Sequence, residues 1–138
     1  MFSKILVPYD VSPSAEEAFD MAVRMLKGGH GSLHVLSVVR PMEIAEDVGT
    51  EADMEHARLY YAGHFPPLSR RAKAQGIHTD FHVRVGHPGQ QIVDFAGELG
   101  VDLIVMGHRG RSAIERWLVG SVAKVVIDHA DCPVLIVR

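Results

Sequence analysis

Short, unbroken runs of apolar residues alternate with amphipathic stretches along the whole chain, and this alternation constrains the fold most strongly. Unbroken runs are typical of strands buried on both faces, as in a parallel sheet covered by helices. One stretch, 77–85, instead alternates apolar with polar residues, which predicts a half-exposed strand at or near a sheet edge. The five predicted strands are residues 5–7, 33–39, 77–85, 103–106 and 134–137.

Amphipathic stretches between these runs predict the helices. The first helix begins at Ser12, a suitable N-cap, with Pro13 in the first helical position, and ends at Gly28-Gly29. The second stretch, 51–75, contains Pro66-Pro67. We expect a kink or two separate helices there, because a proline inside a helix costs ~3 kcal/mol. The remaining helices are predicted over residues 90–99 and from Ser121 to about His129.

This order of elements predicts a single α/β domain over residues 1–138, with a doubly wound, five-stranded parallel sheet and helices on both faces. In such sheets, ligands bind outside the carboxyl ends of the strands, at the point where the strand order reverses. Two segments that directly follow strands are candidates for this position, residues 8–12 and residues 107–110. The sequence therefore predicts a ligand site at the carboxyl edge of the sheet.

The second of these segments opens a glycine motif, G-x2-G-x9-G-S, made of Gly107, Gly110, Gly120 and Ser121. Glycine lets backbone N–H groups approach an anion closely. A helix that begins at Ser121 adds unpaired N–H groups and the positive end of its dipole. Arg109 adds a guanidinium that can bind phosphate oxygens. The motif therefore predicts a phosphate site; the alternative is that its glycines serve only turns and close packing.

Three other features have structural alternatives. Asp10 faces the expected crevice, but aspartate also caps turns and helices. Ser112 and Glu115 form a capping box, which predicts a short helical turn inside the motif, with Trp117 as a packing residue. The nine histidines form no H-E-x-x-H or Cys/His cluster, so solvated or core histidines are favoured over a metal site.

The composition excludes several classes of partner. A net charge of −3 over 138 residues gives no sign of a polyanion partner, so we expect no nucleic-acid binding. Cys132 is the only cysteine, which excludes an intrachain disulfide and favours a cytoplasmic location. No run approaches the ~18 apolar residues of a membrane-spanning helix, so we expect no membrane partner.

Several segments together resemble the universal stress protein family over the whole length of the chain. They are the opening ILVPYDVS at 5–12, Gly86-His87-Pro88, DLIVMG at 102–107, the glycine motif, and the closing CPVLIV at 132–137. The resemblance implies the strand order 3-2-1-4-5, which places the first and fourth strands side by side with a crevice between them. The complete glycine motif resembles the branch of the family that binds ATP.

The resemblance also implies which residues would bind ATP, AMP or ADP, with or without Mg²⁺. The phosphates and ribose would lie among Gly107, Arg109, Gly110, Gly120 and Ser121, with backbone contacts from Val122 and Ala123. The adenosine side would be lined by Pro8, Tyr9 and Asp10, with Asp10 placed for a ribose hydroxyl or a metal-bound water. Val38 would offer backbone groups to the adenine edge, and Met106 directly precedes the motif. Tyr9 is bulkier than the small residue often found there, which predicts a narrower pocket or a stacking ring.

A regulatory protein that binds an adenine nucleotide in a stress response is the favoured function. The sequence lacks the P-loop string G-x4-G-K-[ST] and has no glycine between Pro8 and Ser14, which excludes a P-loop NTPase and a Rossmann dehydrogenase. No nucleophile and general-base set is evident, so turnover is not required. The alternatives are a slow Mg-dependent ATPase or self-phosphorylating enzyme, and an interaction subunit with a vestigial site.

The last apolar run bears on assembly. By the family's strand order, residues 134–137 form an edge strand, and an unprotected apolar edge tends to pair. We therefore expect a homodimer with twofold symmetry that is joined through this strand, together with a protein partner that the sequence does not identify.

Overall fold

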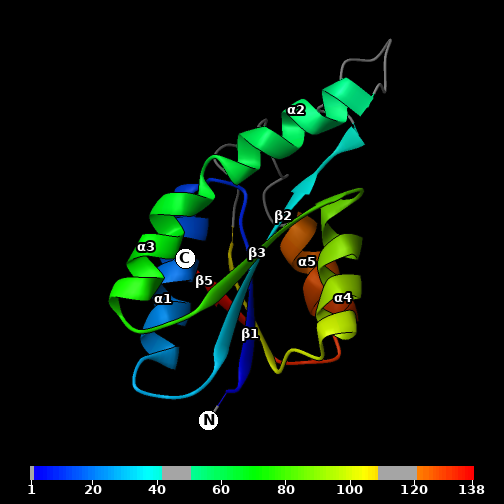
Figure 1. The fold of residues 1–138 in the computed structure, drawn as a ribbon. Helices are drawn as coiled ribbons and strands as arrows, with labels where there is room; N and C mark the ends of the chain where they lie inside the picture. The colour runs from blue at the N-terminus through cyan, green and yellow to red at the C-terminus, as the bar shows by residue number, and fades with distance from the viewer. Residues whose placement is uncertain (1, 42–50, 109–120) are drawn as a thin grey trace.

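A computed structural model describes residues 2–41, 51–108 and 121–138 of the chain. Within these ranges, strands and helices alternate as the sequence predicts (Figure 1). The elements are β1 (Lys4–Pro8), α1 (Pro13–Leu26), β2 (Ser32–Val39), α2 (Glu51–Ala62), α3 (Phe65–Ala74), β3 (Thr79–Val85), α4 (Pro88–Leu99), β4 (Leu103–Gly107), α5 (Ser121–His129) and β5 (Val134–Val137).

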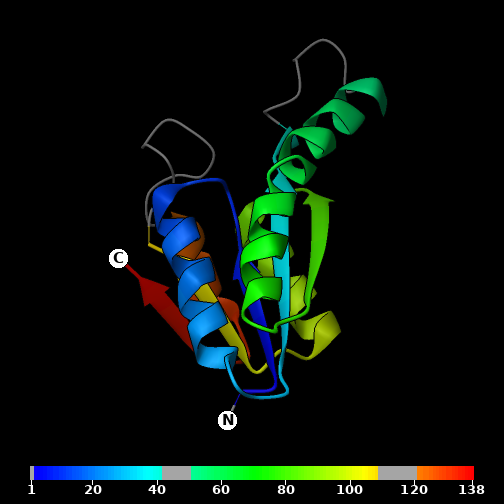
Figure 2. The ribbon, with the colours of Figure 1, turned by 60° about the vertical axis from the view of Figure 1, so that its left-hand side comes forward.

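The five strands form one parallel sheet in the order β3-β2-β1-β4-β5, which confirms the predicted order. β1 lies in the centre, where Ile5 is in register with Leu33 of β2 on one side and with Leu103 of β4 on the other. β3 and β5 are the two edges, and the residues of both are only partly buried. Figure 2 shows β5 at the margin of the sheet, beside the C-terminus.

Helices cover both faces of the sheet, because alternate residues of each buried strand point to opposite sides. Ile5 and Val7 of β1 pack in one core with α1 and α3, and Tyr61 of α2 joins that core. Leu6 of β1 packs in a second core with α4 and α5. The helices α1 and α3 lie on one side of the sheet in Figure 1, and α4 and α5 lie on the other.

The start of α1 confirms the prediction from the sequence. Ser12 is the N-cap, and its hydroxyl accepts a hydrogen bond from the N–H of Ala15 at 3.1 Å. Pro13 follows at the first helical position, where the missing N–H of proline has no cost. Gly28 lies just beyond the helix with a φ of +83°, a conformation that glycine adopts without strain.

The proline pair divides the second helical stretch into two helices, one of the two outcomes that the sequence predicts. α2 ends at Ala62, and α3 begins at Phe65 with prolines in its first turn. Two boundaries differ from the prediction. β3 begins at Thr79 rather than at residue 77, since Ile77 is buried in the core instead of pairing in the sheet. α4 begins at Pro88, because proline is well suited to the first turn of a helix.

Candidate functional site

β1 and β4 are neighbours whose connections run in opposite directions, so the strand order reverses between them. β1 leads through α1 to β2, and β4 leads through α5 to β5. The ladder between β1 and β4 pairs Ile5 with Leu103 and Leu6 with Ile104, and it stops before the carboxyl ends of the strands. The ladder between β1 and β2 continues as far as Pro8 and Leu36. A crevice for a ligand is expected at such a reversal point.

Tyr9 follows β1 directly, but its ring points away from the crevice. The residue is 2% exposed and packs in the core beneath α1 and α3. Its phenol donates a hydrogen bond to the Glu16 carboxylate. Burial, and then this hydrogen bond, raise the pKa of Tyr9 far above its usual value, so the phenol remains a donor at neutral pH. The side chain is therefore occupied inside the protein, and what Tyr9 offers at the carboxyl edge is its main chain.

Both main-chain polar groups of Tyr9 form hydrogen bonds with β2. Its N–H donates to the carbonyl oxygen of Leu36 at 2.8 Å. Its carbonyl oxygen accepts a hydrogen bond of 2.6 Å from the hydroxyl of Ser37, which is fully buried. The sequence did not single out Ser37, although a hydroxyl inside the apolar run LHVLSVV is a usable signal, because buried polar groups nearly always have a partner.

Asp10 and Val11 form a tight turn between β1 and α1. Asp10 is 1% exposed, and its Oδ1 accepts a hydrogen bond of 3.1 Å from the N–H of Ser12. Val11 has a φ of +71°, which is unfavourable for a β-branched residue. Asp10 therefore has the structural role that the sequence left open, because its carboxylate stabilises the turn. A buried carboxylate beside strained backbone is also typical of functional sites.

Gly107, the first glycine of the motif, ends β4 against the first turn of α1. A Cβ atom at this position would lie 2.7 Å from the carbonyl carbon of Ser14 and 2.8 Å from its Cβ. Close packing therefore requires glycine here, which is the structural role that the sequence analysis gave as the alternative to phosphate binding. The same contact brings the carboxyl end of β4 and the N-terminus of α1 together. The next residue, His108, donates its N–H to the carbonyl oxygen of Val137 at 3.0 Å and extends the pairing with β5.

Four predicted site residues meet on the face of the sheet that α4 and α5 cover. Val38 is the next-to-last residue of β2, and Met106 precedes Gly107 on β4. They pack in one apolar cluster with Val122 and Ala123 from the first turn of α5, and none of the four is more than 9% exposed. α5 begins at Ser121, as predicted, and this serine is exposed. Pro8 is buried at the end of β1.

Three predicted phosphate-binding residues, Arg109, Gly110 and Gly120, lie outside the described residues, as do the predicted capping box of Ser112 and Glu115 and the packing residue Trp117. Among the residues that the structure describes, no group of three histidine, cysteine, aspartate or glutamate side chains is arranged to hold a metal ion. In the same ranges, no helix has the length and apolar character that crossing a membrane requires.

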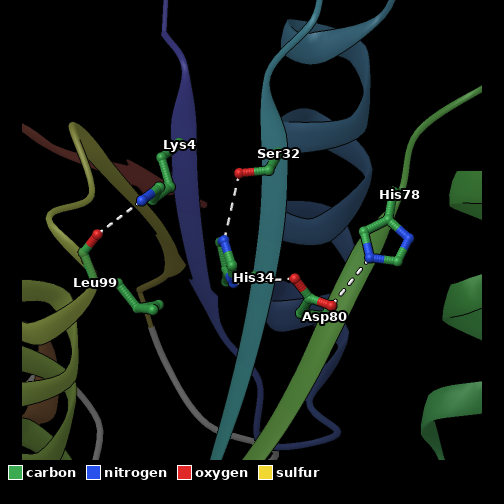
Figure 3. Close-up of polar contacts among 6 residues, drawn as sticks. All are labelled: Lys4, Ser32, His34, His78, Asp80 and Leu99. Atoms are coloured by element: carbon green, nitrogen blue, oxygen red, sulfur yellow. Dashed lines mark hydrogen bonds and ion pairs between the residues drawn. The ribbon is translucent and has the colours of Figure 1, made fainter.

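A second group of polar residues lies at the opposite, amino-terminal edge of the sheet (Figure 3). The Asp80 carboxylate lies between two imidazoles, 3.0 Å from Nε2 of His78 and 3.8 Å from Nδ1 of His34. The Nε2 atom of His34 is 3.3 Å from the hydroxyl of Ser32. A distance of 3.8 Å is too long for the hydrogen bond that orients the histidine in a serine–histidine–aspartate triad. This group therefore lacks the geometry of a hydrolytic site.

A groove of about 220 Å³ lies at the same edge, between the end of α4 and the starts of β4 and β5. Cys132 is half-buried in its wall, where burial, and then the carboxylates of Asp102 and Asp131, raise the pKa of the thiol and make it less reactive. The groove is lined by Val93, Ala96, Gly97, Gly100, Val101, Asp131 and Cys132, none of which belongs to the predicted site.

The sheet order, the reversal point between β1 and β4 and the close packing of Gly107 against the first turn of α1 define a doubly wound α/β protein. The chain belongs to the universal stress protein family, whose family model matches residues 1–138.

Known proteins resemble the chain over nearly its whole length. Universal stress protein YxiE of Bacillus subtilis (strain 168) is 30% identical over 153 residues, which cover 100% of both chains. The solved structure of hypothetical protein MJ0577 has a TM-score of 0.85 at 29% identity and covers 99% of this chain and 96% of that one. A universal stress protein crystallised in complex with cAMP has a TM-score of 0.76 at 26% identity and covers 99% and 97%.

Proposed function

We propose that this chain is a regulatory protein of a stress response that binds an adenine nucleotide at the carboxyl ends of β1 and β4. The observation that carries the proposal is that the end of β4, at the reversal point of the sheet, packs against the first turn of α1 at Gly107 and against the start of α5 at Met106. The sequence holds the complete glycine motif at this place. The solved relative in complex with cAMP gives independent support for an adenine nucleotide as the ligand.

The predicted residues have different proposed roles at this site. Gly107, Arg109, Gly110, Gly120 and Ser121 would bind the phosphates and ribose of ATP, ADP or AMP, aided by the backbone of Val122 and Ala123. Val38 and Met106 would support the adenine edge from the apolar cluster that they form with α5. Pro8 and Tyr9 would act through their main chain, because the Tyr9 ring is buried on the other side of the sheet. Asp10 would accept a hydrogen bond from a ribose hydroxyl or hold a water bound to Mg²⁺.

Binding rather than turnover is the proposed activity. Hydrolysis requires a general base or a nucleophile within hydrogen-bond reach of the reacting groups. In the described part of the site, Asp10 and Tyr9 are the predicted residues with ionisable side chains, and the Tyr9 phenol is hydrogen-bonded to Glu16. The Glu16 carboxylate accepts the phenol hydrogen bond of Tyr9 and pairs with Arg71. We therefore propose occupancy-dependent contacts with a protein partner as the output, with slow Mg-dependent hydrolysis or self-phosphorylation as the alternative.

We further propose a cytoplasmic homodimer joined through β5. This strand pairs with β4 along one side, and its four apolar residues are only partly buried. A second copy would cover the other side and add main-chain hydrogen bonds.

Calorimetric titration of nucleotide-free protein with Mg-ATP tests the proposed function. We expect one saturable site per chain, which Gly110→Val abolishes because a branched side chain replaces the second motif glycine. The matched control Gly97→Val places the same side chain at an exposed position of α4, away from the site, and should bind as the wild type does. No heat of binding up to millimolar Mg-ATP would refute the proposal and favour an interaction subunit with a vestigial site.

A further inference from the structure

We propose that Glu16 and Arg71 are positioning residues for the nucleotide site, and that they act through the Tyr9 phenol to hold the Asp10–Val11 turn in place. The inference rests on the proposed function, and it assigns a role to three side chains that do not themselves line the crevice. Its basis is a continuous chain of hydrogen bonds from α3, across α1, to the residue that precedes Asp10.

The Glu16 carboxylate is the centre of this chain of contacts. Its Oε2 accepts the hydrogen bond from the Tyr9 phenol. Its Oε1 accepts a hydrogen bond of 2.9 Å from Nη1 of Arg71 on α3. The two oxygens of one carboxylate on α1 therefore join α3 to the end of β1. We refer to Tyr9, Glu16 and Arg71 as the tyrosine clamp.

Arg71 is itself held in position by three contacts. Besides Glu16, its Nη2 donates a hydrogen bond of 2.8 Å to Oδ1 of Asp20, one turn further along α1. The guanidinium also lies over the ring of Phe19, 5.2 Å from the ring centre. Burial acts to lower the pKa of Arg71, but the hydrogen bonds that it donates to Asp20 and Glu16 outweigh burial and raise the pKa. The cation is thus permanent, and a planar group with two carboxylate partners has little freedom to move.

The clamp fixes the side chain of Tyr9, whereas β2 fixes its main chain. β2 holds the main chain of Tyr9 through Leu36 and Ser37. The clamp holds the end of its side chain, so that the residue is constrained at its N–H, its carbonyl and its phenol. The next two residues are the buried Asp10 and Val11, whose φ is +71°. Strained backbone of this kind costs ~1–3 kcal/mol and persists only where the surrounding structure over-determines it.

The fold does not require the clamp for packing. α1 and α3 already share an apolar core that includes Phe19, Leu68 and Ala72. The side chain of Arg71 is 39% exposed and that of Glu16 is 35% exposed, and ion pairs with such exposure contribute little to the free energy of unfolding. An ordered network that adds little stability, and that ends on the residue before Asp10, is better explained by positioning.

Two substitutions of the clamp test the inference. Tyr9→Phe removes the hydroxyl that donates to Glu16, and Arg71→Gln removes the cation that orients Glu16. In nucleotide-free protein, we expect both to speed amide hydrogen exchange at Val11 and Ser12 about fivefold or more. Both should also weaken the binding of Mg-ATP by about fivefold, a factor that corresponds to ~1 kcal/mol, the usual size of one hydrogen-bond contribution.

The chain offers a matched control on the other face of the sheet. Arg84 also lies over an aromatic ring, 4.5 Å from the centre of Phe95, and also pairs with a carboxylate, that of Glu98. Arg84→Gln removes the same kind of contact but should leave both the exchange at Val11 and the affinity for Mg-ATP unchanged. Rescue gives a further distinction: Glu16→Gln keeps an acceptor for the phenol and should retain more affinity than Glu16→Ala.

The outcomes separate this inference from the proposed function. If wild-type protein binds Mg-ATP while Tyr9→Phe and Arg71→Gln alter neither exchange nor affinity, the positioning role is wrong. It is also wrong if Arg84→Gln has the same effects as Arg71→Gln. If wild-type protein does not bind Mg-ATP, the proposed function fails and with it the positioning role at a nucleotide site; faster exchange at Val11 in the clamp variants would then show only that the clamp holds the turn.

Discussion

At the scale of single residues, Gly107 shows how a motif residue has a packing role that is separate from ligand binding. We predict that Gly107→Ala lowers the free energy of unfolding by ~1–3 kcal/mol, because the new Cβ atom would lie 2.7 Å from the main chain of Ser14. Chemical denaturation measures the change.

The control for this substitution is Gly97→Ala on α4, where no heavy atom lies within 4 Å of the added Cβ. Alanine there should raise the free energy of unfolding by ~0.5–1 kcal/mol, since glycine is unfavourable inside a helix. Equal effects at the two positions would contradict the close approach of β4 and α1.

At Val11, in contrast to Gly107, we expect a substitution to raise the free energy of unfolding. Glycine adopts a φ of +71° without the strain that valine has there. Relief of ~1–3 kcal/mol of strain should exceed the ~0.5–1 kcal/mol that glycine loses in chain entropy, even with some loss of packing from the partly buried side chain. We therefore expect Val11→Gly to raise the free energy of unfolding by about 1 kcal/mol. A lower midpoint of thermal unfolding than the wild type would show that the valine side chain matters more than its backbone.

At the scale of elements, the interface of β2, β3 and α4 contains two imidazoles that are mostly buried. The rings of His34 and His82 stack with their centres 5.9 Å apart, and His82 packs against Phe95. Burial is the main reason that the pKa of each is lowered, although the nearby Asp80 carboxylate acts to raise both. Lys4 and His78 add to the lowering at His34, and Arg84 adds to it at His82.

These lowered pKa values predict that the protein loses stability in mild acid. The unfolded chain binds protons at an ordinary histidine pKa of about 6.5, whereas the folded protein binds them only at lower pH. Stability is therefore complete above about pH 6.5, and it falls as the pH decreases from there toward the folded pKa values. The double variant with His34→Gln and His82→Gln should show a flatter profile of unfolding midpoint against pH between 7.5 and 5. An unchanged slope would show that His34 and His82 do not cause the loss of stability in mild acid.

Element order and type could be predicted from the sequence because hydrophobic periodicity reports local burial. The break at Pro66-Pro67 and the N-cap at Ser12 followed from the chemistry of single residues. The contacts of Tyr9 were missed, yet strand alternation contained the signal: Ile5, Val7 and Tyr9 are two residues apart and all face α1. The partnership of Glu16 and Arg71 could not be predicted, because 55 residues separate them and only the packing of α3 on α1 brings them together.

In the site, too, some features could be predicted from the sequence and others depend on tertiary structure. The switch point and the residues at the ends of β1 and β4 follow from the topology alone. The cluster of Asp80 with His34 and His78 does not, because it depends on the register between β2 and β3, which places His34 opposite Asp80. Register of this kind is set by the whole sheet rather than by either strand.

At the scale of the whole molecule, the edge strand β5 predicts the assembly. We expect light scattering at micromolar concentration to give about twice the chain mass of 15.1 kDa. Val134→Lys should reduce this to the monomer mass, because a charged side chain on an edge strand opposes pairing. Leu59→Lys is the control: Leu59 is 61% exposed on α2, away from this edge, and its substitution should leave the mass unchanged. A monomeric wild type would contradict the dimer.

We propose above that an adenine nucleotide binds at the carboxyl ends of β1 and β4. The most direct test is to follow the backbone amide resonances of ¹⁵N-labelled, nucleotide-free protein during titration with Mg-ATP. We expect saturable shifts at Asp10, Gly107, Ser121 and Val122, with little change at Asp80 or at Cys132 on the opposite edge. Shifts confined to the opposite edge, or no shifts at millimolar Mg-ATP, would contradict it.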